Sequence, residues 1–184
     1  MGLTDTAAAT DPALATLVSS AAAGDDVAFT RIVVAFHADM AKVAYVVCGG
    51  NRDLAEDAVQ SAWVIAWGRL RTLRDPCRVR AWLMSVTANE ARQLLRRGRR
   101  GTTVGLEFVE ERVGMVDVTG SVTAGDVAAI LDGCTPDERT LIALRYVAGY
   151  DSTEIGALLG ISASGVRSRL ERLLDRIRRD LAYD

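Results

Sequence analysis

The last basic segment of the chain carries side chains that can read duplex DNA. Between Arg167 and Arg179 there are six arginines and two acidic residues. Apolar residues from Val166 to Leu181 fall within an arc of about 100° at helical spacing and predict a core-facing side. Elsewhere on this helix lie arginine, which can bond guanine bidentately, and serine, which can bond a base or a phosphate. The predicted DNA-binding residues are Ser162, Ser164, Arg167, Ser168, Glu171 and Arg172. The alternative is the solvated face of a structural helix.

A second basic segment runs from Arg69 to Arg100, with ten arginines against one Asp and one Glu. Within it, the stretch 79–97 predicts an amphipathic helix with one apolar face. The other face suits unpaired bases, which need stacking surfaces, edge hydrogen bonds and cations for phosphate. Its members are Trp82, Ser85, Asn89, Arg92, Gln93 and Arg96. Alternatively, the tryptophan packs at the edge of the core and the arginines are only solvated.

A helix predicted from Asp53 to Leu70 has a narrow polar face with apolar neighbours. An acidic patch of this kind suits docking onto a basic helix of another protein. Val64 and Trp67 lie on or beside this face. Alternatively, Trp63 and Trp67, four positions apart, both belong to the core, which their spacing favours. The predicted docking residues are Asp53, Glu56, Asp57, Gln60, Ser61 and Val64.

Residues that an enzyme or a metal site would need are scarce. His37 is the only histidine, and the three cysteines, Cys48, Cys77 and Cys134, are far apart. A structural zinc site usually groups four such ligands closely, so we interpret the cysteines as buried or half-buried thiols. There is no glycine-rich phosphate loop, nucleophile elbow or paired-acid motif. We therefore expect no catalytic residue, no metal, no cofactor and no enzyme activity.

Periodicity predicts an all-α protein. Apolar residues from Phe29 to Val47 recur at helical spacing, and the pair Gly49-Gly50 ends that helix. The helix predicted from Asp53 to Leu70 follows. Asp75 before Pro76 then predicts a capped start for the next helical stretch, which continues to about Arg97.

The later part of the chain carries the signals of a helix-turn-helix. Thr135, followed by proline and by Glu138 three positions on, predicts a capping box, and Asp151 with Glu154 repeats it. Gly160 then breaks the chain before the last helix. Two helices joined by a short glycine-containing turn form the helix-turn-helix plan.

Between the two helical parts, the segment 101–125 has five glycines, a charge of −3 (four acids against one arginine) and no helical period. We interpret it as a flexible linker between two small helical domains. The predicted parts are an N-terminal tail at 1–23, a first domain at 24–100, the linker at 101–125 and a second domain at 126–184.

Composition is that of a soluble folded protein, with 49% hydrophobic and 25% charged residues in 184. The net charge is only −2, but local basic stripes govern the attraction of a polyphosphate within a Debye length. No apolar run reaches the roughly eighteen residues that a membrane span requires, and the start lacks the basic region of a secretory signal. We expect a cytoplasmic protein without membrane insertion.

These patterns, in this order, resemble the sigma factors of bacterial RNA polymerase. In the first domain the resemblance rests on residues 24–29, 54–60, 81–83, 88–89 and 94–97, which are similar to the family's region two. In the second domain it rests on residues 153–156, 159–162 and 166–170, which are similar to region four. A short chain with only these two regions resembles the extracytoplasmic-function group.

The resemblance implies that the protein binds core RNA polymerase at the β′ clamp and the β flap and directs it to promoters. The second domain would read the minus-thirty-five element as duplex, and the first would capture unpaired bases of the minus-ten element. The implied minus-ten surface also includes the preceding loop, which adds Arg71, Arg74, Arg78 and Arg80. The family further implies an anti-sigma factor as a partner.

Two other functions stay open at this point. One is a helix-turn-helix transcription regulator that binds duplex DNA without polymerase, although no dimerisation helix is obvious. The other is an all-helical adaptor with no DNA role, which the two basic faces disfavour. Steep weakening with salt would separate a phosphate binder from an adaptor.

Overall fold

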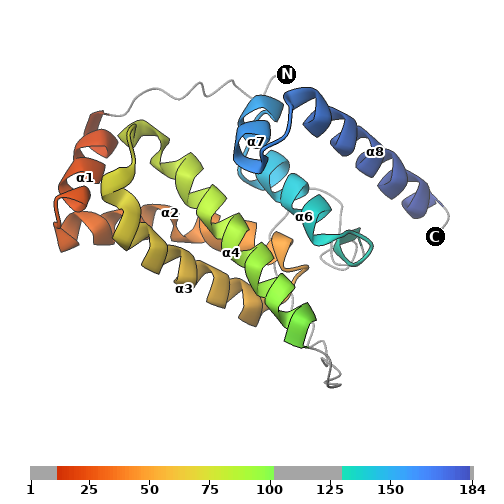
Figure 1. Ribbon diagram of the computed structural model, residues 1–184, viewed down its shortest axis with the longest axis horizontal. Helices are drawn as coiled ribbons and strands as arrows, with labels where there is room; N and C mark the ends of the chain where they lie inside the picture. The colour runs from red at the N-terminus through yellow and green to blue at the C-terminus, as the bar shows by residue number, and fades with distance from the viewer. Residues whose placement is uncertain (1–11, 102–129, 183–184) are drawn as a thin grey trace.

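The computed structural model describes residues 12–101 and 130–182, and every regular element in these two ranges is helical. This confirms the all-α prediction. In the first domain, α1 (Pro12–Ala22), α2 (Asp26–Val47), α3 (Arg52–Arg69) and α4 (Val79–Gly101) pack together (Figure 1). Two short 3₁₀ turns, η1 (Leu70–Thr72) and η2 (Pro76–Arg78), join α3 to α4.

Side-chain caps and glycines set the ends of these helices. The Asp25 carboxylate accepts hydrogen bonds from the backbone N–H groups at the start of α2. Gly49 and Gly50 then turn the chain with φ of 69° and 87°, a region that favours glycine because it lacks a Cβ. Asn51 caps α3 through Leu54 N–H, and the Asp75 carboxylate caps η2.

Helix α1 differs from the predicted N-terminal tail. It packs against α2, η1 and η2, and Val18 and Ala21 are only 2% and 5% exposed. The stretch of alanine, threonine and serine gave little sign of this, but Val18 and its apolar neighbours Leu14 and Leu17 supply a buried side. The rest of the expected tail, 1–11, and all of the expected linker except Gly101 lie outside the described residues.

The described part of the second domain contains α6 (Pro136–Ile142), the π-helical turn η3 (Ala143–Val147), α7 (Ser152–Leu159) and α8 (Ala163–Ala182). Both predicted capping boxes are present, at the starts of α6 and α7. Gly160 ends α7 with φ of 69°. Helices α7 and α8 pack together and form the predicted helix-turn-helix.

One apolar core runs through both domains. Met40 and Val43 of α2 belong to the same buried cluster as Leu141 and Leu144 of the second domain and Ile155 of α7. Helices α6 and η3 pack on α2, and α6 also contacts α4, so the second domain lies beside the first (Figure 1). The sequence predicts two separate bodies and does not predict this contact.

Candidate docking surface and nucleic-acid interface

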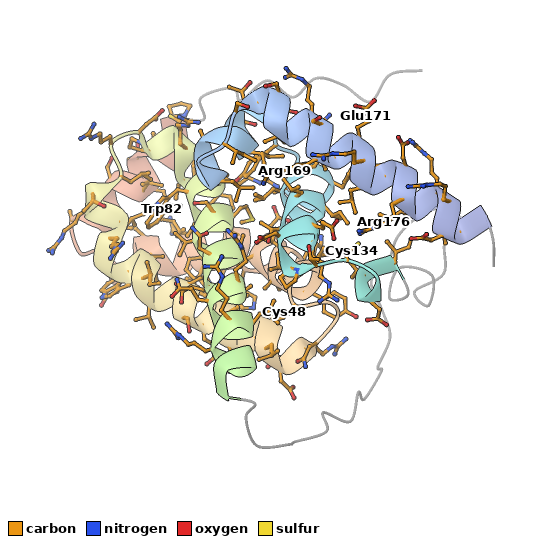
Figure 2. The ribbon with its side chains drawn as sticks, turned by 45° about the vertical axis from the view of Figure 1, so that its right-hand side comes forward. Cys48, Trp82, Cys134, Arg169, Glu171 and Arg176 are labelled. Atoms are coloured by element: carbon orange, nitrogen blue, oxygen red, sulfur yellow. The ribbon has the colours of Figure 1, made fainter. Side chains whose placement is uncertain are left out.

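The predicted DNA-reading face of α8 is exposed. Arg167, Ser168 and Arg172 lie on the surface, while Val166 and Leu170 of the opposite side are buried. Figure 2 shows Glu171 pointing away from the domain. Leu181 is 52% exposed, so the predicted apolar stripe does not reach the core at its C-terminal end, where no other described helix covers it.

Two of the predicted DNA-binding serines, Ser162 and Ser164, make hydrogen bonds at the start of α8. The Ser162 hydroxyl accepts a hydrogen bond from Gly165 N–H at 3.1 Å, which caps the helix. It also lies 3.1 Å from the Ser164 hydroxyl. Both residues are exposed, so each can meet a phosphate at this end of the helix.

A cationic groove of about 640 Å³ lies between α6 and α8, next to α4. Five arginines contribute to its lining, partly balanced by Asp137, Glu138 and Asp175. Arg176 points from α8 toward α6 (Figure 2), where it pairs with Glu138 at 3.0 Å. Burial opposes ionisation of Glu138, but hydrogen bonds from Arg176 and Thr135 outweigh it and lower its pKa. The sequence does not predict this groove, because its walls come from four separate helices, α4, α6, α7 and α8.

On α4, the predicted face for unpaired bases is partly open and partly covered. Asn89, Gln93 and Arg96 are exposed, whereas Trp82 and Ser85 are half-buried. The Ser85 hydroxyl donates to the Trp82 carbonyl oxygen at 2.7 Å. The amide of Gln93 donates to the carboxylate of the buried Glu90 at 2.9 Å.

Arg92 of this face, and Arg80 at the start of α4, contact the second domain while part of each side chain stays exposed. Arg80 pairs with Asp39 of α2 at 3.0 Å and donates to the Ala148 carbonyl oxygen at 2.8 Å. Arg92 pairs with Asp137 of α6 at 2.6 Å. The loop ahead of them stays open, because the predicted DNA-binding residues there, Arg71, Arg74 and Arg78, are exposed.

The predicted docking face of α3 is accessible. Asp53, Glu56, Asp57 and Gln60 are exposed, and Ser61 is half-buried. Val64 extends this face with an apolar side chain that is 73% exposed. A groove of about 420 Å³, which the sequence does not predict, lies between α2 and α3 and is lined by Glu56 and Gln60 among others.

Trp67 does not belong to the core, contrary to the prediction. It is 50% exposed and meets Phe29 edge-on, with ring centroids 4.7 Å apart. Trp63 is half-buried and also meets Phe29 edge-on, with ring centroids 5.8 Å apart, and its indole N–H donates to His37 Nδ1 at 3.3 Å. The helix spacing is correct, but the packing around Trp67 leaves half of its side chain exposed. An aromatic cluster therefore borders the docking face.

The cysteines are free, with Cys48 and Cys134 buried and Cys77 half-buried, as predicted. Burial raises the pKa of Cys48 to about 12, although Arg139 opposes the shift, so this thiol stays protonated. Within 12–101 and 130–182, no cluster of acidic, histidine or cysteine side chains has the grouping of a metal site. No helix in these ranges is long and apolar enough to cross a membrane.

Together, these features describe a two-domain helical protein with a helix-turn-helix, an exposed cationic face on α8 and an exposed acidic face on α3. Residues 32–101 match the family model described as Sigma-70 region 2. Residues 130–179 match the model described as Sigma-70, region 4. The chain belongs to the sigma-70 family of RNA polymerase sigma factors, within the extracytoplasmic-function group.

Named relatives agree with this assignment. The RNA polymerase sigma-E factor of Streptomyces coelicolor is 32% identical over 130 residues, which cover 69% of this chain and 71% of that protein. The ECF RNA polymerase sigma factor SigM of Mycobacterium tuberculosis is 28% identical over 170 residues, 92% of this chain and 85% of that one. A longer relative, "Probable RNA polymerase sigma factor RfaY" of Xanthomonas campestris, is 31% identical over 172 residues, and the match spans 42% of its length.

A solved structure has the same arrangement of helices. The sigma factor CnrH, in complex with the cytosolic domain of CnrY, superposes with a TM-score of 0.68 at 27% identity, covering 94% of this chain and 99% of that chain. Membership of the family favours a polymerase-dependent function over a regulator that acts on duplex DNA alone.

Proposed function

We propose that α3 docks this sigma factor on the β′ clamp of core RNA polymerase, while α4 and α8 hold the two promoter elements. The protein itself makes and breaks no covalent bond. It acts in the cytoplasm, where the polymerase is. The accessible acidic face of α3 is the observation that carries the proposal.

Docking through α3 combines charge with apolar contact. Glu56 and Asp57 supply negative charge to a basic partner, and complementary charges speed and orient association. Val64 and Trp67 lie about two to three turns further along the same helix as exposed apolar side chains. Apolar and aromatic groups of this kind form the centre of protein interfaces, with charges at the rim.

The two promoter elements fit the two cationic faces. Arg167, Ser168 and Arg172 are placed in the first half of α8, the part that a helix-turn-helix inserts into the major groove. The face of α4 offers Trp82 for stacking and Asn89 for base edges, and the arginines of the preceding loop offer cations for phosphate. A flipped base costs a few kcal/mol, which such a stacking surface must offset.

An anti-sigma factor is the expected inhibitor. CnrH has been solved with the cytosolic domain of CnrY. A sigma factor from another bacterium, RpoE of Bartonella quintana, has been solved with the anti-sigma factor NepR. We infer that a protein of the same class holds this chain.

Reversal of charge on α3 tests the docking proposal. The double variant Glu56→Lys, Asp57→Lys should lose copurification with core polymerase, because it turns attraction to a basic clamp into repulsion. Circular dichroism should stay unchanged, since both residues are exposed. The matched control is Asp175→Lys, Asp180→Lys, an equal charge change at exposed sites of α8, which should keep binding. Retention of core polymerase by the α3 variant would remove the docking assignment.

Gel shifts and transcription assays distinguish the proposed function from the remaining alternative, a regulator that binds duplex DNA without polymerase. If the protein is a sigma factor, purified core polymerase should start RNA chains at promoters only when this chain is added. A regulator independent of polymerase would instead shift duplex DNA equally well with and without core enzyme.

A further inference from the structure

The groove between α6 and α8 has a cationic wall that most of the proposed function does not use. Four arginines of α8 line it, and we call them the arginine stripe: Arg169, Arg172, Arg176 and Arg179. Their helical spacing places them within an arc of about 80° and along about 15 Å of the helix axis. Like charges three and four positions apart on a helix repel one another. The stripe is therefore destabilising until an anion lies against it.

The arginine stripe lies on a different side of α8 from most of the proposed DNA-reading face. Figure 2 shows Arg169 and Arg176 on the side of α8 that faces α6, whereas Glu171 points away from it. Arg167 lies about 160° around the helix from Arg169. Only Arg172 belongs to both sets, so the groove and the DNA-reading face share one cation.

The acidic residues that line the groove already have cationic partners. Asp137 pairs with Arg92 at 2.6 Å, and Glu138 pairs with Arg176 at 3.0 Å. Asp175 pairs at 2.7 Å with an arginine that does not line the groove. None of the three acids is thus left to neutralise the rest of the stripe.

Three guanidinium groups of the stripe remain available to a ligand. Among residues 12–101 and 130–182, Arg169, Arg172 and Arg179 form no ion pair, and all three are exposed. The Nε–H of Arg172 donates to the Ser168 carbonyl oxygen, and that of Arg179 donates to the Asp175 carbonyl oxygen. These bonds orient the two side chains and leave their terminal amino groups to bind an anion.

Arg92 brings an unsatisfied donor to the same groove from α4. Its Nε atom is buried and has no hydrogen-bond partner among the described residues, although a terminal nitrogen pairs with Asp137. A buried N–H without a partner costs free energy. A small rotation of this side chain within the groove would bring the N–H to an anion and recover the lost hydrogen bond.

The groove has the size and the chemistry of a site for a phosphate chain. Its volume of about 640 Å³ lies in the range of roughly 300–1,000 Å³ that small-molecule sites occupy. Guanidinium groups bind phosphate oxygens through paired, parallel hydrogen bonds. A row of them can meet several linked phosphates in turn, whereas a single phosphate would meet only part of the row. Leu141, Leu159 and Leu173 add an apolar wall beside the arginines.

We propose that the groove between α6 and α8 binds a small polyphosphate, a chain of two or more linked phosphates, through the arginine stripe and Arg92. The chain is either inorganic or the phosphate tail of a nucleotide, whose base would pack on the leucine wall. The recessed groove favours such a ligand over a rigid DNA duplex. The inference requires neither polymerase nor promoter.

Isothermal titration calorimetry on the full-length chain tests this, at fixed ionic strength and with no divalent cation. Inorganic tripolyphosphate and ATP should each saturate one site, about tenfold or more tightly than AMP, because AMP meets fewer guanidinium groups. Tighter binding of ATP than of tripolyphosphate supports a nucleotide, and the reverse order supports an inorganic chain. Absence of saturable binding, or equal binding of AMP, would overturn the proposal.

The double variant Arg169→Ala, Arg179→Ala tests the stripe itself. It should weaken tripolyphosphate binding about tenfold or more, since two sets of charge-assisted hydrogen bonds are lost. The matched control is Arg167→Ala, Arg178→Ala, which removes the same charge from exposed sites of α8 outside the groove and should change the affinity less than about twofold. Equal losses in the two variants would indicate diffuse attraction to α8 and contradict a site in the groove.

A second pair of variants tests the contribution of α4. Arg92→Lys keeps the positive charge facing Asp137 but removes the planar guanidinium group and its Nε–H. It should weaken tripolyphosphate binding about threefold or more. Arg96→Lys, an exposed position of the same helix outside the groove, should leave the affinity unchanged. Equal affinity of the two variants would exclude Arg92 from the site and contradict the proposal as stated.

Duplex DNA is the competing occupant of the stripe. If tripolyphosphate does not saturate the chain while Arg169→Ala, Arg179→Ala weakens gel shifts on duplex DNA, the stripe belongs to the DNA interface and the proposal is wrong. Failure of the proposed function gives a different result. It would appear as absence of transcription with core polymerase, whatever the calorimetry shows.

Discussion

Gly156 allows the two helices of the helix-turn-helix to approach closely. An added Cβ at this position would lie 2.6 Å from the Ile161 carbonyl oxygen and 3.3 Å from the Ala163 nitrogen. Both are backbone atoms, so the turn itself would have to move. The Gly156 carbonyl oxygen also accepts from the Ile161 N–H at 3.0 Å, which fixes the turn at the same point.

We expect Gly156→Ala to destabilise the protein by about 1–3 kcal/mol, as overpacking does. The matched control is Gly68→Ala in α3, where nothing lies within 4 Å of the added Cβ and alanine should gain up to about 1 kcal/mol of helix propensity. Urea unfolding of both variants measures the difference. Equal stability of the two variants would show that the helix-turn-helix tolerates a side chain here.

Arg167 belongs to the exposed half of α8 that is proposed to read the minus-thirty-five element. We expect Arg167→Ala to weaken promoter protection there by about 1–3 kcal/mol, roughly ten- to a hundredfold, if it reads a base. The fold should not change. Arg178→Ala, near the far end of α8 and paired with Asp175 at 2.7 Å, is the control with little expected effect. Footprinting with the holoenzyme measures both, and unaltered protection in Arg167→Ala would remove this residue from the interface.

Local signals at the residue scale were predictable, and distant pairs were not. The capping boxes of Thr135 with Glu138 and Asp151 with Glu154 each lie within one helical turn, so their spacing alone indicates them. The pair of Arg92 and Asp137 joins residues 45 positions apart. Nothing in the spacing of residues along a helix indicates which distant acid an arginine will meet.

At the scale of elements, periodicity located α2, α3, α4, α7 and α8 but not the depth at which each face is buried. Trp67 has the spacing of a core residue, yet it packs edge-on against Phe29 and stays 50% exposed. Helix α1 shows the opposite error, since its small residues suggested a tail. A periodic pattern indicates which residues share a face, whereas packing partners decide whether that face is buried.

Glu138 links α6 to α8. Its carboxylate forms an ion pair with Arg176 and accepts a hydrogen bond from the backbone N–H of Thr135. Because the pKa of Glu138 is lowered in the folded state, its ionisation stabilises the fold above the unfolded pKa of about 4.3. That contribution is lost as pH falls through the folded pKa.

We therefore expect Glu138→Gln to cost about 0.5–1 kcal/mol near neutral pH, because glutamine keeps the capping shape but not the charge. The difference from wild type should shrink as pH falls below the unfolded pKa of about 4.3 and through the lower folded pKa. Urea unfolding over a series of pH values measures it. Glu171→Gln, at an exposed position of α8 with no ion pair among the described residues, should show no such difference, and a pH-independent loss in Glu138→Gln would contradict the charge-based account.

For the whole molecule, the sequence indicates two helical domains because a glycine-rich acidic segment separates them. It does not indicate that α6 and η3 rest on α2. The apolar side chains that make this contact have the same helical spacing as those inside each domain, so nothing distinguishes them beforehand. The exposed docking face of α3 was predictable, since it needs only one helix.

Sharing one core between the domains makes separation hazardous for the free protein. Leu144 and Met40, each at most 1% exposed, belong to the same buried cluster. Separating the domains exposes apolar surface of both to water, and large exposed patches of this kind favour self-association. Separation of the two domains away from the polymerase therefore carries a risk of aggregation. The risk is smallest where a partner covers the apolar surface that the separation exposes.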